Sequence, residues 1–277
     1  MSDFKRIVTI QDISCVGQCS ITVALPVISA CGIETSVVPS AVLSTHTGGF
    51  TGYTFRDLTE DMPKIREHWL KENLKFDAVY TGYLGSAKQI QYVIDFFDTV
   101  GNENCVNIVD PAMADNGKLY SGFDESFVDA MRKLIPKADY LLPNITEACL
   151  LTGMEYIPDA DAGYIKQLLK KLCDMGAMNV ILTGECLECD KTGFVLYNGK
   201  EFLDYAHQKL SRSSHGTGDI YASAFTGALM RGKSAYDAAK VAADFVVECI
   251  KCTMKDPNHT YGARFEPVLY KLYEMLK

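Results

Sequence analysis

The residues with the clearest chemical potential form a short turn, Ser213 to Asp219, directly before a stretch rich in small residues. The centre of this turn is Gly216-Thr217-Gly218. Its two glycines let the backbone turn tightly, and the N-terminus of a following helix offers unpaired N–H groups and a partial positive charge to an anion. The pattern therefore predicts an anion site. Asp219 has two interpretations here, as an N-terminal helix cap or as a functional carboxylate beside the anion.

Polar side chains also follow three of the predicted strands. Asp110 follows the apolar run VNIV, Asn144 follows YLLP, and Tyr83 follows AVYTG. In an open parallel sheet ligands sit at the carboxyl ends of the strands, where these residues would meet. Each has an ordinary structural alternative, such as a capping or ion-pair acid for Asp110 and a half-buried aromatic for Tyr83. Their shared position favours a binding site.

A second glycine-rich segment, Gly227 to Ser234, matches the P-loop pattern GxxxxGKS. A P-loop follows a strand and opens a helix, so that its N–H groups point at phosphates. The residues around Gly227, DIYASAFTGALM, instead predict a helix that contains this glycine. Gly232-Lys233-Ser234 is then expected to end that helix and to cap the next one. We therefore reject a phosphate site at Lys233.

These motifs need a framework, and most of the chain alternates short β-branched runs with longer segments of helical period. This alternation predicts an α/β fold of repeated β-α-β units, with a mostly parallel central sheet and helices on both faces. After Gly184, two short candidate strands flank Asn198-Gly199, a strong hairpin signal. The chain is expected to be mostly helical from Asp219 onward. Because the sequence has no linker, charge block or internal repeat, we expect residues 1–277 to form one domain.

The composition argues against several classes of partner. The chain has 277 residues, with 27 Lys and Arg against 35 Asp and Glu, and a formal net charge of −8. Surfaces that bind nucleic acid or anionic membranes need clustered cations, so neither partner is expected. The longest mostly apolar stretch, Ile21 to Ile33, contains Pro26 and is shorter than the ~20 residues of a membrane helix. The first residues lack a signal-peptide pattern, so we expect a cytoplasmic protein.

The ten cysteines are expected to be reduced and mostly buried, because the chain is large and shows no export signal. Two pairs, Cys186/Cys189 and Cys249/Cys252, have the CxxC spacing found in zinc sites. Cys249 and Cys252 lie in a run of helical period, AADFVVECIKC, which favours packing in a core over metal binding.

Gly-Thr-Gly-Asp followed by the helix IYASAFTGAL resembles the C-terminal motif of the ribokinase superfamily, and further segments narrow the resemblance to the pyridoxal kinases. In chain order these segments are Ser44-Thr45-His46-Thr47-Gly48, Thr81-Gly82-Tyr83-Leu84-Gly85-Ser86, Asp110-Pro111-Ala112-Met113-Ala114-Asp115, and Pro143-Asn144-Ile145-Thr146-Glu147. Each motif is weak alone, but five in this order, spread over nearly the whole chain, are specific. The resemblance implies a ribokinase-like three-layer sandwich.

The resemblance also implies an activity. An ATP-dependent kinase would phosphorylate the primary 5′ hydroxyl of pyridoxal, pyridoxamine or pyridoxine, with Mg²⁺ as cofactor and as a homodimer. The turn Gly216-Thr217-Gly218 would stabilise the transferring phosphoryl group, and Asp219 would take the proton from the acceptor hydroxyl. Mg²⁺ would be held by Asp110, Asn144 and Glu147; ATP would contact Asp110, Asn144, Thr183 and Thr217; the substrate would contact Asp12, His46, Thr47 and Tyr83.

Two departures from the family pattern concern the substrate. Asp12 stands in Ile10-Gln11-Asp12, where the family usually has Ile-Gln-Ser, and His215 stands where an apolar residue often precedes the Gly-Thr-Gly-Asp turn. Two alternatives therefore stay open: a hydroxymethylpyrimidine or phosphomethylpyrimidine kinase with the same phosphate machinery, and a vitamer-binding regulator without turnover.

Several of the implied residues also have ordinary structural interpretations. Glu147, like Asp110, could be a capping or ion-pair acid, and His46 could be a loop histidine whose nitrogens are satisfied by the protein. Three aromatic residues after His46 are interpreted either as a mobile flap over the substrate or as core residues: Phe50, Tyr53 and Phe55.

Overall fold

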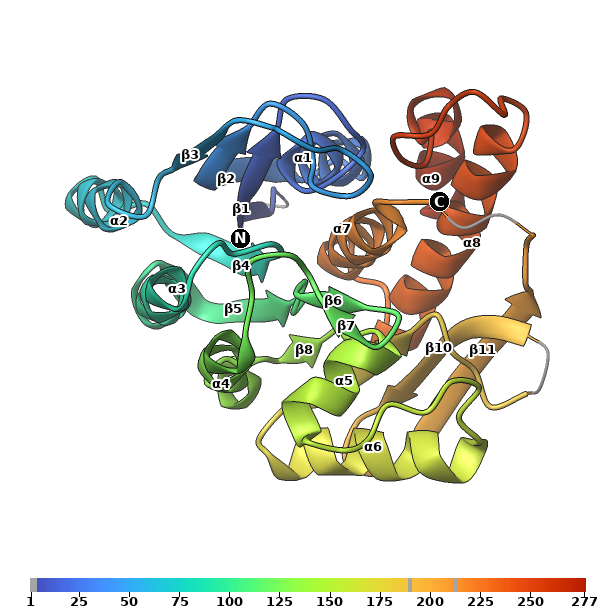
Figure 1. Ribbon diagram of the computed structural model, residues 1–277. Helices are drawn as coiled ribbons and strands as arrows, with labels where there is room; N and C mark the ends of the chain where they lie inside the picture. The colour runs from blue at the N-terminus through green and yellow to red at the C-terminus, as the bar shows by residue number, and fades with distance from the viewer. Residues whose placement is uncertain (1–3, 189–190, 212–213) are drawn as a thin grey trace.

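The computed structural model describes residues 4–188, 191–211 and 214–277, and one large sheet runs through it (Figure 1). Its strands are β1 (Arg6–Ser14), β2 (Glu34–Leu43), β3 (Phe55–Asp57), β4 (Phe76–Thr81), β5 (Gly101–Val109), β8 (Tyr140–Leu141), β9 (Asn179–Thr183), β10 (Lys191–Tyr197) and β11 (Phe202–Gln208). Their order is β11-β10-β9-β8-β5-β4-β1-β2-β3. The pairs from β9 to β2 are parallel, whereas β3, β10 and β11 pair antiparallel at the edges. The predicted mostly parallel sheet is confirmed.

Helices cover both faces of the sheet (Figure 1). One layer contains α1 (Ile21–Ala30), α7 (Thr217–Met230), α8 (Ala235–Thr253) and α9 (Leu269–Met275). The other contains α2 (Met62–Lys71), α3 (Ala87–Thr99), α4 (Glu125–Arg132), α5 (Ile145–Thr152) and α6 (Ala162–Asp174). The expected three-layer sandwich is therefore confirmed. Short 3-10 turns, Ile135–Lys137 and Glu266–Val268, and a small hairpin of β6 (Ala114–Asp115) and β7 (Lys118–Leu119), complete these elements.

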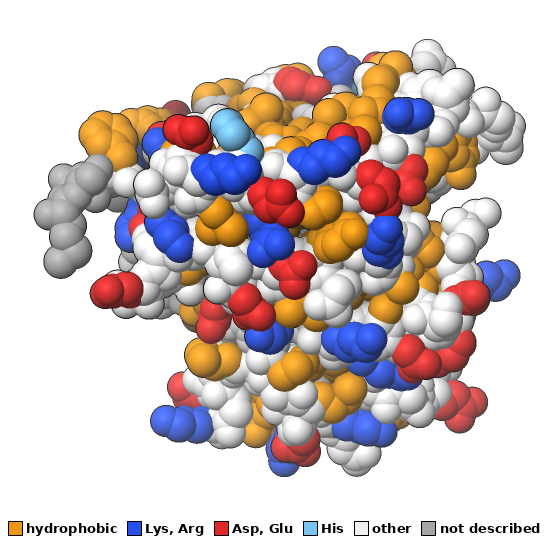
Figure 2. Space-filling model, turned by 90° about the vertical axis from the view of Figure 1, so that its left-hand side faces the viewer, with side chains coloured by type: hydrophobic (Ala, Val, Ile, Leu, Met, Phe, Trp, Pro, Cys, Tyr) orange, Lys and Arg blue, Asp and Glu red, His pale blue; other side chains and the backbone are white. Residues whose placement is uncertain are grey.

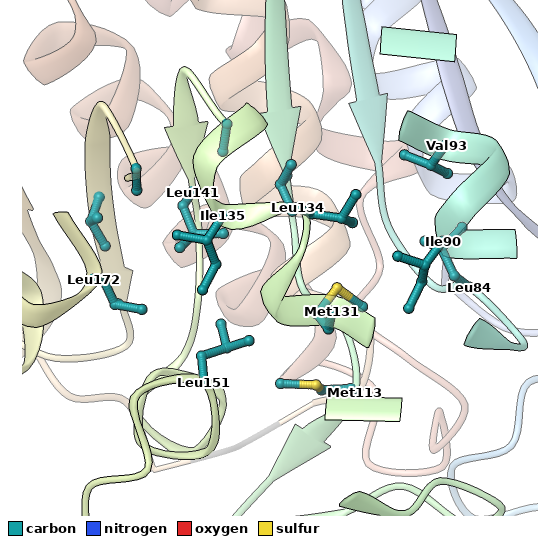
Figure 3. Packing of buried hydrophobic residues seen from close by; sticks show 14 of the residues in the cluster. Leu84, Ile90, Val93, Met113, Met131, Leu134, Ile135, Leu141, Leu151 and Leu172 are labelled. Atoms are coloured by element: carbon teal, nitrogen blue, oxygen red, sulfur yellow. The ribbon is translucent and has the colours of Figure 1, made fainter. Parts of the chain in front are cut away.

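A separate apolar core fills the space on each side of the sheet. Along β1, Val8 and Ile10 face the α2–α6 layer while Ile7 faces the α1/α7 layer, as the period-2 geometry of a strand requires. Figure 3 shows leucine, isoleucine and methionine side chains of the first core meeting between strands and helices, among them Leu134 and Leu141. Burial of each such side chain contributes ~1.5–3 kcal/mol, so the two cores fix the sheet that carries the site.

The chain crosses to opposite faces of the sheet after two neighbouring strands. β1 leads into α1 in one layer, whereas the adjacent parallel strand β4 leads into α3 in the other. Such a switch point opens a crevice beyond the carboxyl ends of the two strands. Asp12 lies near the end of β1 and Tyr83 just after β4, so both belong to this crevice.

The local turn signals are also confirmed. Strands β10 and β11 form an antiparallel hairpin, in which the Asn198 side-chain oxygen accepts the N–H groups of Lys200 and Glu201 at 3.0 and 2.9 Å. Gly227 lies inside α7, and Ser234 caps α8 by accepting the Asp237 N–H at 3.1 Å. The P-loop match is therefore wrong as a phosphate site, since no strand precedes its glycine.

The surface shown in Figure 2 has no large cluster of cationic side chains, as the sequence composition predicts. On the face formed by α2, α3 and α4, positive and negative side chains are interspersed (Figure 2). Some of them pair, as Lys137 does with Asp98 at 2.7 Å. In the described parts of the chain, no helix is long and apolar enough to cross a membrane.

Candidate active site

A cavity of about 1020 Å³ opens at the carboxyl ends of the parallel strands, and it is large enough for two ligands side by side. Every residue that the sequence singled out for a catalytic, substrate, nucleotide or metal role lines it: Asp12, His46, Thr47, Tyr83, Asp110, Asn144, Glu147, Thr183, Gly216, Thr217, Gly218 and Asp219. They come from seven separate segments. The sheet topology brings these segments together, because all the contributing strands end on the same edge.

The anion turn forms the N-terminus of α7. Gly216 is the N-cap residue and has φ +75°, a left-handed conformation that favours glycine. A Cβ at Gly216 would lie 1.6 Å from the Gln18 carbonyl oxygen, so the turn packs directly against the loop before α1. Gly218, in contrast, has open space where a Cβ would point. Ser213, the first residue of the predicted motif, lies outside the described residues.

Asp219 lies in the first turn of α7 and is not its cap, because Gly216 occupies that position. The carboxylate opens to the cavity but is otherwise surrounded by protein, and this burial raises its pKa to about 7. The Ser20 N–H, which faces the carboxylate, lowers the pKa, and the nearby Asp12 charge raises it. Asp219 is therefore close to half ionised at neutral pH, the range that suits a general base.

Two further carboxyl groups, Asp110 and Glu147, lie buried along the same cavity. Burial raises the pKa of Asp110 well above its usual range, and the negative charges of Glu147 and Asp219 add to the effect. Burial also raises the pKa of Glu147 to about 8, although its oxygens accept the N–H groups of Met113 at 3.1 Å and Asn144 at 2.9 Å. A divalent cation would offset this repulsion, and carboxylate oxygens are the ligands Mg²⁺ prefers.

Asn144 has a structural function that the sequence left open. Its side-chain oxygen accepts the Glu147 N–H at 2.9 Å, and its amide donates to the Ala114 carbonyl at 2.8 Å. Together with the Glu147 carboxylate it forms a capping box at the start of α5. The second lone pair of the Asn144 oxygen is thus left for a metal, and the second N–H of its amide is left for a phosphate. Thr183, at the end of β9, donates to the Pro143 carbonyl at 3.3 Å and lines the cavity beside it.

Asp12 lies at the substrate end of the cavity and is 3% exposed. The Ser14 hydroxyl donates to its carboxylate at 2.9 Å. Burial raises the pKa of Asp12, while the Ser20 and Ser14 hydroxyls lower it. Tyr83 lies near this charge, with its ring 5.5 Å from that of Phe123, and burial together with Asp12 raises its pKa to about 12. The Tyr83 hydroxyl therefore stays protonated and can donate.

His46 is held by the protein at both ring nitrogens. The Gly48 N–H donates to Nδ1 at 3.1 Å, so Nε2 carries the proton and donates to the Tyr261 carbonyl at 3.2 Å. Burial lowers the pKa of His46, which favours the neutral ring. This geometry agrees with the interpretation of a satisfied loop histidine, and it leaves only the ring face to a substrate. Its neighbour His215, with ring centres 5.5 Å apart, is exposed to the cavity.

The aromatic residues after His46 do not belong to either core. Phe50 packs edge-on against His46, with ring centres 5.1 Å apart, and Phe55 is 48% exposed on the edge strand β3. Tyr53 is half-buried. The core interpretation is therefore wrong for these three residues, and the flap interpretation stays a prediction.

Several cavity residues carried no signal in the sequence. Four of the five histidines line the cavity, and His207 and His259 belong to no motif. Ser20 and Cys19 also line it, and Ser20 has φ +54°, an unusual conformation for a residue other than glycine. These residues come together through the packing of segments far apart in the chain, which sequence spacing does not reveal.

The cysteines that the structure describes give no indication of a metal centre. Cys249 is buried in α8, and burial raises its pKa, as expected for a packed thiol. Cys189 lies outside the described residues. Within the part of the chain that the structure describes, no group of three or more His, Cys, Asp or Glu side chains has the geometry to hold a metal by itself. A magnesium ion at Asp110 and Glu147 would thus need further oxygens from water or from ATP.

A family model described as phosphomethylpyrimidine kinase matches residues 17–264, which include every predicted site residue except Asp12. The chain belongs to the phosphomethylpyrimidine kinase family. Its members are ribokinase-like kinases, so the predicted resemblance is confirmed and the protein is a phosphotransferase with an alcohol acceptor. Asp12 is thus the one proposed substrate residue for which the family match supplies no counterpart.

This chain is similar both to hydroxymethylpyrimidine and phosphomethylpyrimidine kinases and to a pyridoxal kinase. The chain is 33% identical over 217 residues, 78% of each chain, to the hydroxymethylpyrimidine/phosphomethylpyrimidine kinase of Bacillus subtilis. It is 38% identical to a phosphomethylpyrimidine kinase structure from Bacteroides thetaiotaomicron crystallised with pyridoxal, with a TM-score of 0.91 over 97% of this chain and 96% of that one. It is 25% identical to the pyridoxal kinase of Staphylococcus aureus in complex with AMP-PCP and pyridoxal, with a TM-score of 0.80 over 95% and 93% of the two chains.

Proposed function

We propose that this family member is a pyridoxal kinase that transfers the γ-phosphoryl group of ATP to the primary hydroxyl of a pyridoxal-type vitamer. The proposal rests mainly on the position of Asp219, which lies beside the anion turn at the N-terminus of α7 and near the Asp12 charge. Support comes from the relatives, since one binds pyridoxal and another binds pyridoxal together with an ATP analogue. The cavity, at about 1020 Å³, has room for both.

In this proposal Asp219 is the general base. The acceptor oxygen attacks the γ-phosphorus while its proton passes to the Asp219 carboxylate, and the bond between the γ-phosphorus and the bridging oxygen of ADP breaks. A base with a pKa of about 7 is available in its ionised form at neutral pH and is basic enough to accept the proton. The first N–H groups of α7, at Thr217 and Gly218, face the negative charge that develops on the phosphoryl oxygens.

Asp110 and Glu147 would hold Mg²⁺, with Asn144 as a further contact. When bound, the ion neutralises charge on the β- and γ-phosphates. The residues themselves place two carboxylates at the nucleotide end of the cavity, where each raises the electrostatic cost of ionising the other. We further propose that Thr183 and Thr217 contact the phosphates of ATP.

A second candidate function is hydroxymethylpyrimidine kinase, which the likeness to the Bacillus subtilis enzyme favours. The charges of the cavity distinguish two possible acceptors of such a kinase, hydroxymethylpyrimidine and its monophosphate. Five carboxylates line the cavity, and Lys118 is the one Lys or Arg side chain that lines it within the described residues. An acceptor that already carries a phosphate would meet repulsion from Asp219 and Asp12, so we expect an uncharged or cationic alcohol.

The remaining properties are proposals of the same kind. Residues 1–277 would act as one kinase domain, in the cytoplasm and as a homodimer. A regulator without turnover is disfavoured because a protein that only binds a vitamer needs neither a carboxylate at the anion turn nor a buried acidic pair.

The test is a substrate panel. The protein is mixed with ATP, Mg²⁺ and one acceptor at a time: pyridoxal, pyridoxamine, pyridoxine, hydroxymethylpyrimidine or its monophosphate. We expect the highest kcat/KM with a pyridoxal-type acceptor and no turnover of the monophosphate. Preference for hydroxymethylpyrimidine would replace the main proposal with the second one, and binding without turnover would support a regulator.

A further inference from the structure

The loop between β2 and β3, residues 44–54, carries the proposed substrate residues His46 and Thr47 along one side of the cavity. Its inner half is fixed, because the His46 N–H donates to the Val16 carbonyl at 3.1 Å and the ring is held at both nitrogens. Residues 49–53, in contrast, form no hydrogen bond within the described parts of the chain. The position of this outer half therefore depends on the strand that follows it, β3.

Strand β3 has little burial of its own. It is the last strand of the sheet (Figure 1), and all three of its residues are exposed. Because little apolar surface is buried, packing contributes little to holding the strand in place. Directly after β3 the chain turns inward, and Thr59 is buried. The end of the loop is therefore held mainly by polar contacts around Asp57 and Thr59.

A buried side chain of α3, Gln89, makes these contacts. Gln89 is 1% exposed, and its amide nitrogen donates to the Thr59 hydroxyl at 2.8 Å and to the Asp57 carboxylate at 3.2 Å. The same nitrogen donates to the Ser40 carbonyl of β2 at 2.9 Å. The Asp57 oxygen also accepts the Thr59 N–H at 2.8 Å and the Thr59 hydroxyl at 2.5 Å. Strand β2, the end of β3 and helix α3 thus meet in one hydrogen-bond network.

The other end of the Gln89 amide contacts the segment that carries Tyr83. Its oxygen accepts the Gly85 N–H at 2.7 Å. Ser40, a partner of Gln89, donates its hydroxyl to the Tyr83 carbonyl at 3.3 Å. A Cβ at Gly85 would lie 3.6 Å from the ring of Phe55, so β3 packs directly against this segment. Gln89 therefore joins the segment after β4 to β3, although β1 and β2 separate these two strands in the sheet.

Asp57 is the charged member of this network. Partial burial opposes its ionisation, but its hydrogen bonds and the Lys88 charge outweigh this effect and lower the pKa of Asp57. Hydrogen bonds to an ionised acceptor are stronger than those between neutral groups. Both ends of the Gln89 amide have partners, so the network is satisfied and rigid, as a buried polar group requires.

We propose that Gln89 is a positioning residue for the acceptor, holding the outer half of the 44–54 loop and the Tyr83 segment in fixed positions at the acceptor end of the cavity. Gln89 does not itself line the cavity, so it acts through these two segments. Without its hydrogen bonds, the loop would have to be ordered when the acceptor binds, which weakens binding. The inference rests on the proposed function, because it takes this end of the cavity as the acceptor site.

The central experiment is Gln89→Leu, which roughly keeps the size of the side chain and removes its hydrogen bonds. We expect the KM for pyridoxal to rise about tenfold, because binding must then order the loop. The dissociation constant of pyridoxal without ATP, measured by calorimetry, should rise by the same factor. In contrast, kcat at saturating pyridoxal and the KM for ATP should stay within about twofold of wild type, since Asp219 and the anion turn lie outside the network.

A second variant, Thr59→Val, keeps the shape of the side chain and removes only its hydroxyl. It takes one partner from Gln89 and one donor from Asp57, so the KM for pyridoxal should rise in the same direction but by a smaller factor. In the double variant with Gln89→Leu, the two effects should be less than additive, because both break the same contact. Thr59→Val keeps the proposal testable if Gln89→Leu does not fold.

The matched control is Val93→Ala. Val93 lies four residues after Gln89 on the same helix, is buried, and packs in the core of the α2–α6 layer. Its truncation leaves a cavity in that core and should lower the Tm without removing any hydrogen bond of the network. The KM for pyridoxal should stay at its wild-type value in this variant, even where the Tm falls as far as in Gln89→Leu.

Hydrogen exchange provides a readout that does not depend on turnover. The Leu58 N–H donates to the Ser40 carbonyl at 3.0 Å, and the Thr54 N–H donates to the Ser44 hydroxyl at 2.9 Å. Both amides should exchange faster in Gln89→Leu, because they lie on the part of the chain that the network holds. The amides of β4 should keep their protection.

Two results would overturn the inference. Unchanged pyridoxal affinity and KM in Gln89→Leu would show that the acceptor site does not need the network. An equal rise of KM in Val93→Ala would show a general effect of lower stability. Failure of the proposed function differs from both, because the wild type itself would then neither bind nor phosphorylate pyridoxal. In that case the exchange measurement, and the KM for the acceptor that the substrate panel selects, decide the inference.

Discussion

The Asp219 carboxylate combines two opposing effects in one residue. Burial at the start of α7 raises its pKa to about 7, whereas the Ser20 N–H lowers it. An ordinary exposed aspartate, with a pKa near ~3.9, would be a weak base for an alcohol proton. The position that shields Asp219 from water is thus also what fits it for proton transfer.

The pH dependence of the reaction follows from this shift. Asp219 must be ionised to accept a proton, so kcat/KM should fall as the pH drops below about 7 and reach a plateau above it. Asp219→Asn should lower kcat by roughly 10²–10⁴ and abolish this limb, with ATP affinity nearly unchanged. A pH series of initial rates for both proteins, with ATP binding measured by calorimetry, checks the prediction. Near wild-type turnover in the variant would leave Asp219 a structural residue.

A second residue-scale prediction concerns Asp12, whose carboxylate lies buried at the substrate end and accepts the Ser14 hydroxyl. Pyridoxamine carries an ammonium group that pyridoxal and pyridoxine lack, and a hydrogen bond between charged groups contributes ~1.5–3 kcal/mol. Asp12→Ser should therefore reduce the preference for pyridoxamine over pyridoxal by about tenfold or more, as measured by kcat/KM. Equal losses for both substrates would instead indicate contact with the shared ring nitrogen. Ser14→Ala removes a partner of Asp12 but keeps its charge, and serves as the control.

The sequence identified residues of the site where a motif and a strand end coincide, as at Asp110 and Tyr83. It missed Ser20 and His259 because neither stands in a recognisable pattern. Ser20 lines the cavity with an unusual backbone conformation, and His259 reaches the cavity from the loop after α8. Positions of this kind depend on how distant elements pack, which residue type and spacing do not specify.

At the scale of elements, helix α7 carries the anion turn at one end and a packed surface along its length. Gly227 of α7 has no room for a side chain, because a Cβ there would lie 2.4 Å from the sulfur of Cys31, the C-cap residue of α1. This close approach of two helices explains the glycine that gave the false P-loop match. Lys233→Ala, beyond the end of the helix, should accordingly leave ATP affinity unchanged in a binding assay.

The two glycines of the anion turn should respond differently to alanine. Gly216→Ala places a side chain on a left-handed backbone, which costs roughly 1–2 kcal/mol, and against the Gln18 carbonyl, so Tm and activity should both fall. Gly218→Ala meets open space and gains helix propensity, so Tm should hold or rise. Its methyl group instead enters the space of the phosphoryl group, and kcat should fall. Full activity of Gly218→Ala at wild-type Tm would exclude the turn as the phosphoryl site.

The elements themselves were predicted where they are long. The strands β1, β2, β4, β5 and β9 and the helices between them follow the apolar pattern, because both sheet faces are buried. The short strand β3, with three exposed residues, and the hairpin of β6 and β7 were not predicted. Two- and three-residue strands have no period of their own and form only because a neighbouring strand edge is available.

At the scale of the whole molecule, the acidic cavity makes stability depend on pH and metal. Glu147, Asp219 and Asp110 all have pKa values raised by burial, to about 8 for Glu147 and about 7 for Asp219. The native state therefore binds more protons than the unfolded chain wherever the pH lies between the ordinary carboxyl range and these values. Stability must fall as the pH rises through this window. The ionised carboxylates that the proposed catalysis needs therefore destabilise the folded state.

We therefore expect a lower Tm at pH 8 than at pH 6 in the absence of divalent ions, by several degrees for a chain of this size. Mg²⁺ should narrow the difference, because a ligand that binds only the native state with ionised carboxylates stabilises it most at high pH. His46, whose lowered pKa favours folding at high pH, acts in the opposite direction and is common to all variants.

The variant Glu147→Gln tests the contribution of this one carboxylate. It loses an acceptor for the Asn144 or Met113 N–H and should be less stable at every pH. Its Tm should nevertheless depend less on pH and on Mg²⁺. Melting curves of the wild type and of Glu147→Gln at pH 6 and pH 8, with and without Mg²⁺, test this prediction. If the Tm of the variant depends on pH and Mg²⁺ as strongly as that of the wild type, the magnesium binds elsewhere.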